Sequence, residues 1–426
     1  MSERLTSIVS SANRNDTDFP LNNLPYGVFS ENAGESHKPR CGVAIGDYVL
    51  DVAALETAGV IDLGQALLQQ AAWNDLMAAG PATWQSLRDQ LLALLGTDSQ
   101  QQSEVKAALV PLANVELHMP FAVSEYTDFY AGRQHAFNVG TMFRGPENAL
   151  PPNWLHIPIG YNGRASSVVV SGTTVIRPQG QLKGPLDKAP HFGPARRFDI
   201  ELEMGAIVGT PSNGPISVEQ ADANLFGYVL LNDWSARDIQ AWEYQPLGPF
   251  QAKATATSIS PWIVTKAALE PFRINTPERE HPLLPYLEEP GPMLYDIDLE
   301  VSMQPQTAST ASVLSRTNYR EMYYSSPQQL AHHTTSGCPM RTGDLLGSGT
   351  ISGAGKDSYG SLLELSWGGK EPFTLDTGEV RSFIEDGDTL TLRGAAIAEH
   401  YRIGFGSCTG TVVAGDYPAT TDTRTS

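Results

Sequence analysis

The stretch RRFDIELEMGAIVG, residues 196–209, combines an apolar strand pattern with three closely spaced carboxylates. Side chains of a β-strand alternate between two faces, so Ile, Leu and Met share one face while Asp199, Glu201 and Glu203 share the other. Three carboxylates on one face repel one another, and burying them is costly unless they are paired or bound to a cation. The stretch therefore predicts a strand whose acidic face needs cationic partners inside the fold.

The length and composition of the chain indicate a two-domain globular protein. Its 426 residues exceed what one core usually serves, and 41% apolar with 18% charged residues is typical of a well-packed protein. With 28 basic and 47 acidic residues the net charge is −19, so binding to a nucleic-acid backbone is not expected. The chain shows neither a secretory signal nor an apolar run of membrane-spanning length. We therefore expect a soluble, cytoplasmic protein without nucleic-acid or membrane partners.

Several motifs typical of other chemistries are absent from the sequence. The three cysteines form no CxxC pair, which disfavours a disulfide framework and a thiolate zinc site. No GxSxG or HExxH occurs, and GSGTIS lacks the last glycine of GxGxxG. His332 and His333 are adjacent and would diverge on a helix, so they are a poor metal-binding pair.

The character of the chain changes near residue 118. Residues 20–55 hold short apolar runs that predict strands, and residues 61–110 are rich in Ala, Leu and Gln with helical spacing. Strand-like runs dominate after that, including SSVVVSGTTVI, FGYVLLND, MLYDIDLEVSM, LLELSW and DTLTLRGAA. We expect a fold that is mainly β with some α, divided into a domain at residues 1–118, a larger domain at 119–418 and a disordered tail at 419–426.

A further acid, Asp233, ends the apolar run in FGYVLLNDWSARDIQAWEY, and a helix is predicted to begin two residues later. An acid at such a junction can simply cap the helix, a role worth about 1 kcal/mol. Arg237, Gln240 and Tyr244 follow Asp233 at helical spacing and share one face. A cation, an amide and a phenol on one face indicate a surface that binds oxygen atoms, although amphipathic surface helices show similar faces.

Three other segments carry candidate catalytic groups. Asp128 and His135 are seven residues apart in SEYTDFYAGRQHAFNVG, so a helix would place both on one side. Lys253 lies in the otherwise uncharged stretch GPFQAKATATSISPW, where it either faces solvent or meets an anion. Glu364 lies within the predicted strand LLELSW and needs a partner. A histidine fits that need, because a carboxylate fixes the tautomer of an imidazole and raises its basicity.

Each of these features has an ordinary structural reading, but together they indicate one chemistry. Oxygen ligands without thiolates favour a hard cation such as Mg²⁺ or Ca²⁺. A histidine with an orienting carboxylate can act as a base, and nearby cationic and amide donors can stabilise an oxyanion. This combination is what metal-assisted attack of water on a carbonyl requires.

At these residues the chain resembles the fumarylacetoacetate hydrolase family. The resemblance covers nearly the whole chain and is strongest from about 120 to 410. The motifs that carry it are YTDFYAGRQHAFNVGTMFRG, NWLHIPIGYNGRASSVVVSG, RRFDIELEMG, NDWSARDIQAWEYQPLGPFQAKATATSISPW and TGDLLGSGTISG. It implies a small SH3-like barrel for the N-terminal domain, a β-roll for the larger domain, and a homodimer.

The resemblance also implies roles for individual residues. It implies a metal site at Asp128, Glu201, Glu203 and Asp233, with further metal contacts at Lys253 and Thr257 through backbone oxygens. His135 becomes the catalytic base, oriented by Glu364, while Arg237, Gln240 and Lys253 become the donors that stabilise negative charge. The implied substrate contacts are Tyr130, Arg144, Tyr161, Gln240, Tyr244 and Thr350. Asp199 is left without a role, and we expect it to pair with Arg196 or Arg197 or to lie outside the strand.

The implied reaction is hydrolysis of the carbon–carbon bond of fumarylacetoacetate, a diketo dicarboxylate, to fumarate and acetoacetate. This is the last step of tyrosine and phenylalanine catabolism. Two alternatives stay open: a relative that decarboxylates or isomerises another oxo acid, and a non-catalytic protein whose acids hold a structural Ca²⁺.

Overall fold

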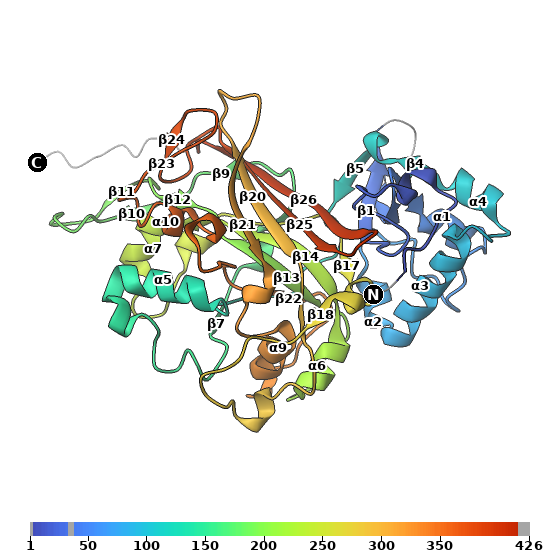
Figure 1. The fold of residues 1–426 in the computed structure, drawn as a ribbon, viewed down its shortest axis with the longest axis horizontal. Coiled ribbons are helices and arrows are strands. Elements are labelled where there is room, and N and C mark those ends of the chain that lie inside the picture. Colours follow the sequence, from blue (N-terminus) through green and yellow to red (C-terminus); the bar gives the residue numbers. More distant parts are fainter. Residues whose placement is uncertain (1–2, 33–37, 416–426) are drawn as a thin grey trace, which may run out of the picture.

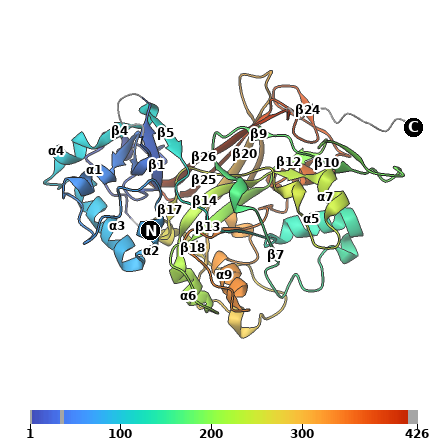
Figure 2. The ribbon, with the colours of Figure 1, turned by 180° about the vertical axis from the view of Figure 1, so that it is seen from behind.

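The computed structural model describes residues 3–32 and 38–415, so the predicted tail at 419–426 lies outside the described residues. Figure 1 shows a smaller domain formed by the N-terminal residues beside a larger domain formed by the rest of the chain. Seen from behind in Figure 2, α5 and α7 lie at the end of the larger domain that is remote from the smaller one.

The smaller domain is built on an antiparallel sheet of five strands in the order β4-β3-β2-β1-β5. The strands are β1 (Tyr26–Glu31), β2 (Arg40–Ile45), β3 (Tyr48–Asp51), β4 (Leu109–Pro111) and β5 (Val115–His118). The helices beside them are α1 (Val52–Thr57), α2 (Asn74–Ala78), α3 (Pro81–Leu95) and α4 (Gln102–Ala107).

The helical character predicted for residues 61–110 is confirmed only in part. Pro81 is the first residue of α3, where its missing amide hydrogen costs nothing. Residues 61–73, however, form an irregular, bent segment instead of a helix. The Glu56 carboxylate accepts the amide hydrogens of Leu67 and Leu68 there, so these amides are not available to a helix.

The larger domain contains an eight-stranded sheet, β7-β6-β22-β13-β14-β16-β8, in which β17 also pairs with β14. Its strands are β6 (Tyr126–Phe129), β7 (Gly160–Asn162), β8 (Val168–Val170), β13 (Leu202–Val208), β14 (Leu225–Asp233), β16 (Thr257–Ile259), β17 (Val264–Thr265) and β22 (Leu345–Gly347). A second sheet of five strands has the order β21-β20-β25-β26-β9. Its strands are β9 (Val175–Ile176), β20 (Asp298–Gln304), β21 (Ser312–Asn318), β25 (Thr389–Ile397) and β26 (Arg402–Val413).

Short hairpins and helices complete the larger domain. Four strand pairs lie outside the two main sheets: β10 (Gln179–Leu182) with β11 (His191–Pro194), β12 (Phe198–Asp199) with β15 (Ser235–Ala236), β18 (Arg273–Ile274) with β19 (Leu294–Tyr295), and β23 (Phe373–Thr374) with β24 (Val380–Arg381). The helices are α5 (Arg133–Arg144), α6 (Val218–Asn224), α7 (Arg237–Glu243), α8 (Lys266–Leu269), α9 (Ser326–Thr334) and α10 (Leu362–Leu365). In the described ranges, none of the helices is both long enough and apolar enough to cross a bilayer.

The two main sheets pack face to face over a large apolar core. Leu230 of β14, Leu392 of β25 and Ile403 of β26 are fully buried in it. A Cβ atom at Gly394 would lie 2.9 Å from the Leu230 side chain, so glycine permits the close approach of the sheets at this point.

The other face of the eight-stranded sheet has two parts, of which one packs against the N-terminal domain and the other carries the acids of the candidate site. Tyr126, Ile207, Leu231 and Leu345 belong to the same hydrophobic cluster as the core of the N-terminal domain. Since side chains alternate along a strand, the same face continues two residues beyond Tyr126, Leu231 and Leu345. The face that packs against the N-terminal domain is thus also the face that carries the candidate site.

The opening stretch forms a strand that is interrupted at residues 200–201, between β12 and β13. The amide of Ile200 donates to the Asp199 carboxylate, and the amide of Glu201 donates to the Asn232 side chain. These side-chain acceptors take the place of a strand partner. The register with the paired segment of the chain is the same on both sides of the interruption, and the Asp233 amide still donates to the Glu201 carbonyl, so Glu201 and Glu203 share one face as predicted.

Candidate active site

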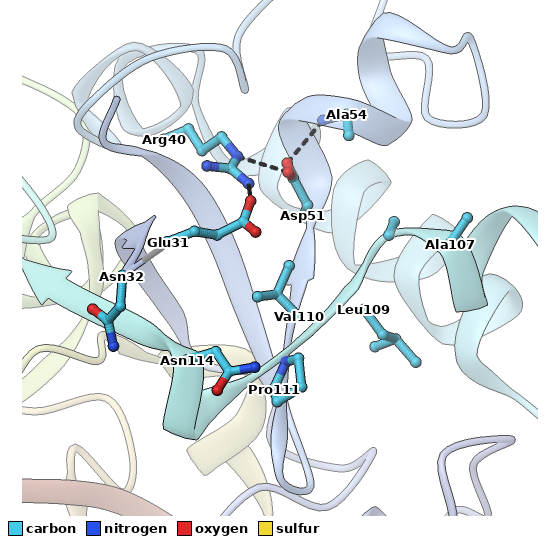
Figure 3. Close-up of a pocket in the computed structure, with 11 residues that line it drawn as sticks. Glu31, Asn32, Arg40, Asp51, Ala54, Ala107, Leu109, Val110, Pro111 and Asn114 are labelled. Atoms are coloured by element: carbon cyan, nitrogen blue, oxygen red, sulfur yellow. Dashed lines mark hydrogen bonds and ion pairs between the residues drawn. The ribbon is translucent and has the colours of Figure 1, made fainter. Parts of the chain in front are cut away.

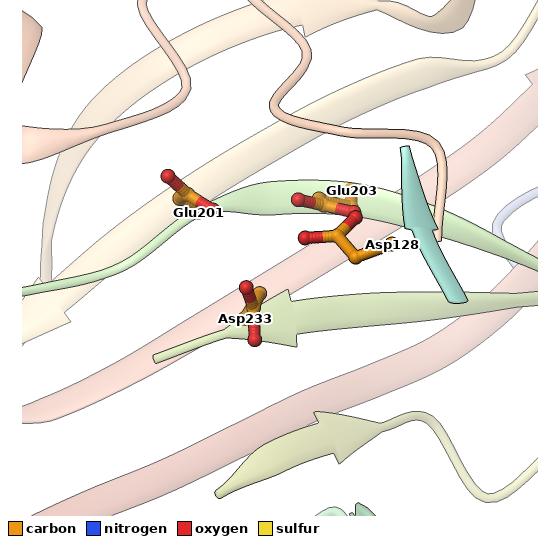
Figure 4. Close-up of side chains that lie close together, drawn as sticks. All are labelled: Asp128, Glu201, Glu203 and Asp233. Atoms are coloured by element: carbon orange, nitrogen blue, oxygen red, sulfur yellow. The ribbon is translucent and has the colours of Figure 1, made fainter. Parts of the chain in front are cut away.

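Four buried carboxylates meet at the ends of neighbouring strands (Figure 4). Asp128 lies on β6, Glu203 on β13 and Asp233 at the end of β14, while Glu201 immediately precedes β13. One oxygen from each of the four lies within 4.8 Å of the others. The structure thus brings together all four acids for which a metal site was predicted. Asp233 belongs to β14, and the residue that caps α7 is Ala236, so the alternative helix-cap role of Asp233 is wrong.

Gly347 of β22 makes room for this cluster. Strand β22 pairs in parallel with β6, which places Gly347 opposite Asp128. A Cβ atom at Gly347 would lie 2.8 Å from Asp128 Oδ1 and 2.9 Å from Glu203 Oε2. Only glycine therefore leaves the space between these two carboxylates open.

The oxygens of the cluster are incompletely paired, as a cation site requires. Asp128 Oδ1 and Glu203 Oε1 are buried and form no hydrogen bond with any described residue. Burial and the surrounding carboxylates raise the pKa of Asp128 and of Glu203 well above their usual range. Because all the donors are hard oxygens, the residues fit a cation such as Mg²⁺ or Ca²⁺.

Lys253 forms ion pairs with Glu201 and, at 2.7 Å, with Asp233. Burial alone would raise the pKa of Glu201, but the charges of Lys253 and Arg237 outweigh it and lower that pKa to about 2. The Thr257 hydroxyl donates to Asp233 Oδ1 at 3.2 Å, and the Tyr161 hydroxyl lies 3.0 Å from Asp128 Oδ2. The side chains of Lys253 and Thr257 therefore contact the acids, whereas backbone contacts to a metal stay a prediction.

His135 lies beside the cluster and is oriented by Glu364. The distance from His135 Nδ1 to Glu364 Oε2 is 2.6 Å, and His135 Nε2 lies 3.9 Å from Glu201 Oε1. An ionised carboxylate accepts only, so Nδ1 carries the proton and Nε2 keeps its lone pair on the side of the acids. Burial would raise the pKa of Glu364, but His135 and the hydrogen bonds from Asn138 and Ser361 outweigh it, and the pKa is lowered.

The elements that carry this pair differ from those predicted. Asp128 lies on β6 and His135 on α5, so the two do not share a helix as their spacing suggested. Glu364 lies in the helical turn α10, so the predicted strand LLELSW is wrong. The Ser361 hydroxyl accepts the Glu364 amide and begins this turn.

Arg237 connects the acids to α7. Its Nε donates to Asp199 Oδ2 at 2.8 Å, and its Nη1 lies 2.8 Å from Glu201 Oε1 and 3.3 Å from Gln240 Oε1. Arg237 Nη2 is buried and has no hydrogen-bond partner among the described residues. This nitrogen is therefore a buried donor that stays available.

Asp199 has a different partner from those expected. It pairs with Arg237 and not with Arg196 or Arg197, whose amides instead donate to Asp238. Asp199 also accepts the amide hydrogens of Leu362 and Leu363 at 2.7 and 3.0 Å. Asp199 thus joins the arginine of the site to α10, the turn that carries the orienting carboxylate.

The predicted substrate contacts fall into two groups. The Tyr130 ring packs edge-on against His135 at 5.6 Å, and the Thr350 hydroxyl is buried without a partner in the described chain. Arg144 and Tyr244 are exposed at the ends of α5 and α7. Among the described contacts, neither of these two touches the acid cluster, and Arg144 donates to the carbonyls of residues 148 and 149.

Two family profiles cover almost the whole chain. The profile described as Fumarylacetoacetate (FAA) hydrolase C-terminal matches residues 125–413, and that described as Fumarylacetoacetase N-terminal matches residues 22–120. The chain belongs to the fumarylacetoacetate hydrolase family.

Relatives in this family match along nearly their full length. A fumarylacetoacetase from Arabidopsis thaliana is 47% identical over 410 residues, covering 93% of this chain and 96% of the relative. A fumarylacetoacetase from Homo sapiens is 46% identical over 408 residues, covering 93% and 97% respectively. The solved fumarylacetoacetate hydrolase from psychrophilic Exiguobacterium antarcticum has a TM-score of 0.53 at 16% identity, over 92% of this chain and 100% of that one. This structure supports the fold alone, and the predicted fold class is confirmed.

Several residues of this family member's site were not predicted from the sequence. Asn138 donates to Glu364 Oε1 at 2.8 Å, and Ser352 and Ser361 donate to Glu364 Oε2 at 2.9 and 2.7 Å. Asn138 follows His135 by three residues on α5, and Ser361 precedes Glu364 by three, the spacing of a capping pattern. These two spacings were the available signals, whereas no local pattern singles out Ser352.

A separate hollow in the N-terminal domain of this family member offers no comparable chemistry (Figure 3). Arg40 there donates to Asp51 at 2.6 Å and to Glu31 at 2.7 Å, and its guanidinium lies over the Phe29 ring. Both carboxylates of the hollow pair with Arg40, whose Nη1 is buried without a partner among the described residues, so the hollow lacks the unpaired carboxylate oxygens that mark the acid cluster.

Proposed function

We propose that this protein hydrolyses the carbon–carbon bond of fumarylacetoacetate to give fumarate and acetoacetate. The observation that carries the proposal is the His135–Glu364 pair, whose free Nε2 lies 3.9 Å from the acid cluster. The family membership and the fumarylacetoacetases at about 46% identity support the same reaction. A structural cation site would need neither the histidine nor the donors around it.

The proposed cofactor is Mg²⁺ or Ca²⁺, held by Asp128, Glu201, Glu203 and Asp233. When bound, the cation supplies Lewis-acid polarisation of the diketone oxygens and counters the charge of the four carboxylates. Lys253 and Thr257 are proposed to complete this environment, since their side chains already contact Asp233.

His135 is proposed as the general base. Its Nε2 takes a proton from water, and the resulting hydroxide adds to the carbonyl next to the fumaroyl group. Glu364 keeps the imidazole in the required tautomer and stabilises the imidazolium that forms. General-base catalysis of this kind typically contributes about 10²–10⁴ in rate.

Arg237, Gln240 and Lys253 are proposed to stabilise the tetrahedral alkoxide. The unpartnered Nη2 of Arg237 supports this role, because a buried donor without a partner can pair with developing negative charge at no loss elsewhere. One such donor is typically worth about 10²–10³ in rate. The carbon–carbon bond then breaks because the departing carbanion is delocalised as an enolate, and a proton transfer from the imidazolium completes acetoacetate.

The substrate is proposed to be held through its two carboxylates and its oxygens by Tyr130, Arg144, Tyr161, Gln240, Tyr244 and Thr350. Burial raises the pKa of Tyr130 and of Tyr161, so both phenols stay neutral donors. Arg144 and Tyr244 are exposed on neighbouring helices, where we expect them to meet the outer carboxylate.

A homodimer is part of the proposal. Phe192, Trp242, Leu247 and Phe250 are exposed by 59%, 42%, 94% and 65%. They lie on β11, on α7 and just after α7, and the Trp242 indole donates to Gln181 of the paired strand β10. A second copy would remove this apolar surface from water. We further propose a role in tyrosine and phenylalanine catabolism in the cytoplasm.

The test is incubation of purified protein, loaded with Mg²⁺ or with Ca²⁺, with fumarylacetoacetate. We expect loss of the diketone absorbance with matching release of acetoacetate, and a His135→Ala variant that folds and binds the cation but has lost at least about 10² of the rate. Release of CO₂, or absorbance loss without acetoacetate, would identify a different oxo-acid reaction. Turnover of His135→Ala within tenfold of the parent would exclude His135 as the base.

A further inference from the structure

A pocket of about 480 Å³ lies between the N-terminal and the larger domain, and none of the proposed catalytic, metal or substrate residues lines it. One wall is a face of α3, where Pro81, Trp84, Gln85 and Arg88 recur at helical spacing. The remaining lining comes from Tyr26, Ala223, Leu225, Phe226, Thr265, Lys266, Ala267 and Glu270. Pockets of this size at domain boundaries are common sites for small molecules.

Aromatic side chains form the apolar part of the pocket. The ring of Trp84 packs edge-on against Phe226 at 5.0 Å, and Tyr26 lies 5.6 Å from the same ring. A Cβ atom at Gly209 would lie 2.6 Å from the Trp84 indole, so glycine there allows the indole to take up this position. Such a lining suits a flat apolar body.

Arg88 brings to the pocket a positive charge that the neighbouring carboxylate of Asp89 offsets only through space, without an ion pair. Its Nη1 and Nη2 donate to the backbone carbonyls of Asn23 and Asn22. Within residues 3–32 and 38–415, Arg88 forms no ion pair, and burial lowers the pKa of its guanidinium. Arg40 of the hollow in Figure 3, by contrast, has two carboxylate partners. A desolvated cation that no carboxylate contacts is unusual in a chain of net charge −19.

The other charged groups of the pocket are already paired. Lys266 pairs with Asp222, and Glu270 pairs with Arg273, which also contacts Asp222. These four charges cancel, so the charge of Arg88 decides what the pocket attracts.

Thr265 supplies a hydroxyl group without a hydrogen-bond partner in the described chain. It stands at the N-cap of α8, yet its hydroxyl caps no amide. The residue is only 6% exposed, and its Oγ1 has no hydrogen-bond partner among the described residues. A buried hydroxyl without a partner is costly, and a ligand that hydrogen-bonds to it would remove that cost.

We propose that this interdomain pocket binds a small organic monocarboxylate with a flat apolar body. Arg88 pairs with the carboxylate, Thr265 offers it a hydrogen bond, and Tyr26, Trp84 and Phe226 cover the apolar body. Because the two walls belong to different domains, the bound anion holds α3 against the segment around α8.

The test uses 2-naphthoate as the probe and 2-naphthamide as its uncharged analogue, titrated into the cation-loaded protein by calorimetry. We expect one saturable site per chain for the carboxylate, with about tenfold or greater weakening for the amide and for Arg88→Gln. The Thr265→Val variant should also bind less tightly. Arg14→Gln is the matched control, because Arg14 is an exposed arginine of the same domain that pairs with Asp47 and does not line the pocket.

The remaining outcomes overturn the proposal. Equal affinity of Arg88→Gln and the parent would place the anion elsewhere, including the acid-cluster site, and equal binding of the amide would show that charge is not recognised. Absence of saturable binding to the parent would exclude the pocket directly. Should Arg88→Gln not fold, parental affinity for 2-naphthoate in both Thr265→Val and Trp84→Leu would likewise show that the anion does not bind in this pocket. Arg88→Gln is expected to keep the basal turnover, since Arg88 lies outside the site.

Discussion

Glu364 accepts four side-chain hydrogen bonds, from His135, Asn138, Ser352 and Ser361, so its orientation toward the imidazole is fixed from several sides. Such an arrangement holds a base in one tautomer and in one position, which matters more for catalysis than for packing. The same residues leave Nε2 of His135 free toward the acids.

Replacing Glu364 by Gln should lower kcat by about 10² or more while changing KM little. The amide can still hold the ring, but it can neither stabilise an imidazolium nor enforce the tautomer with Nε2 unprotonated. The measurement is the pH–rate profile with fumarylacetoacetate. Glu371→Gln is the control, because Glu371 is exposed and pairs with Lys356 at the surface. A parental profile in Glu364→Gln would remove the orienting role.

Replacing Asp199 by Asn should lower both stability and kcat. The change removes the negative partner of Arg237 and weakens the hydrogen bonds that hold α10, at a cost of about 1–3 kcal/mol in the free energy of unfolding. Asp388 is a matched control, since it is also buried, pairs with Arg381 and accepts a backbone amide.

Urea unfolding and steady-state kinetics of the two variants separate the effects. Asp388→Asn should lose stability and keep kcat, whereas Asp199→Asn should lose both. If the folded fraction of Asp199→Asn turns over as fast as the parent, Asp199 serves stability alone.

Single residues were predictable where chemistry selects the residue type. Buried acids, a histidine and a lysine in an uncharged stretch stand out in the sequence because each would be costly without a partner. Asn138 does not stand out in this way, and Asp199 stands out as an acid without indicating which residues it contacts. Their partners are 226 and 163 residues away in the chain, and only the folded structure brings them together.

At the scale of elements, long periodic segments were the most predictable. The apolar run FGYVLLND lies within β14, DTLTLRGAA after its first residue lies within β25, and Pro81 begins α3. The strand predicted for LLELSW was wrong because an apolar stretch of this length fits a buried strand and a buried helix equally well. The Ser361 hydroxyl and the Asp199 carboxylate accept amide hydrogens of α10 and so favour the helical turn. Asp199 comes from a distant segment of the chain, so the local sequence does not show its effect.

The strand β22 offers a test of how the elements shape the cation site. Gly347→Ala should keep the fold but weaken Mg²⁺ or Ca²⁺ binding by about tenfold or more, because the added methyl lies between Asp128 and Glu203. Calorimetric titration of the protein, after a chelator has removed its cation, measures this affinity. Gly291→Ala is the control, since a Cβ atom there meets no neighbour within 4 Å. Parental affinity in Gly347→Ala would place the cation away from these two oxygens.

At the scale of the whole molecule, removal of the cation should lower the melting temperature. Without it, Lys253 and Arg237 are the cations that face four buried carboxylates, and two carboxylate oxygens stay unpaired. Asp128→Asn should therefore raise the melting temperature of the chelated protein and abolish most of the gain on adding Mg²⁺ or Ca²⁺. Melting curves recorded with and without a chelator test this prediction. An equal rise in melting temperature on adding the cation to the variant and to the parent would contradict the predicted site.

The change of character near residue 118 indicated two domains, but the sequence could not predict how they share one sheet face. Tyr26 stacks on Trp73 at 4.5 Å and pairs through its backbone with Ile263. Contacts of this kind join residues that are distant in the chain, and no local pattern encodes them.

The shared face of the eight-stranded sheet has a consequence for how the chain can tolerate change. On β14, one pleat separates Leu231, beneath the N-terminal domain, from Asp233 in the acid cluster, and Tyr126 and Asp128 repeat this on β6. Replacing an aliphatic residue beneath the N-terminal domain would thus change the orientation of a carboxylate on the same strand without contacting it. We expect activity to fall in such variants, although the replaced residue only packs against the N-terminal domain. By the same reasoning, a fragment of residues 119–426 would expose an apolar surface directly beside the carboxylates. We expect this fragment to aggregate and to show no activity.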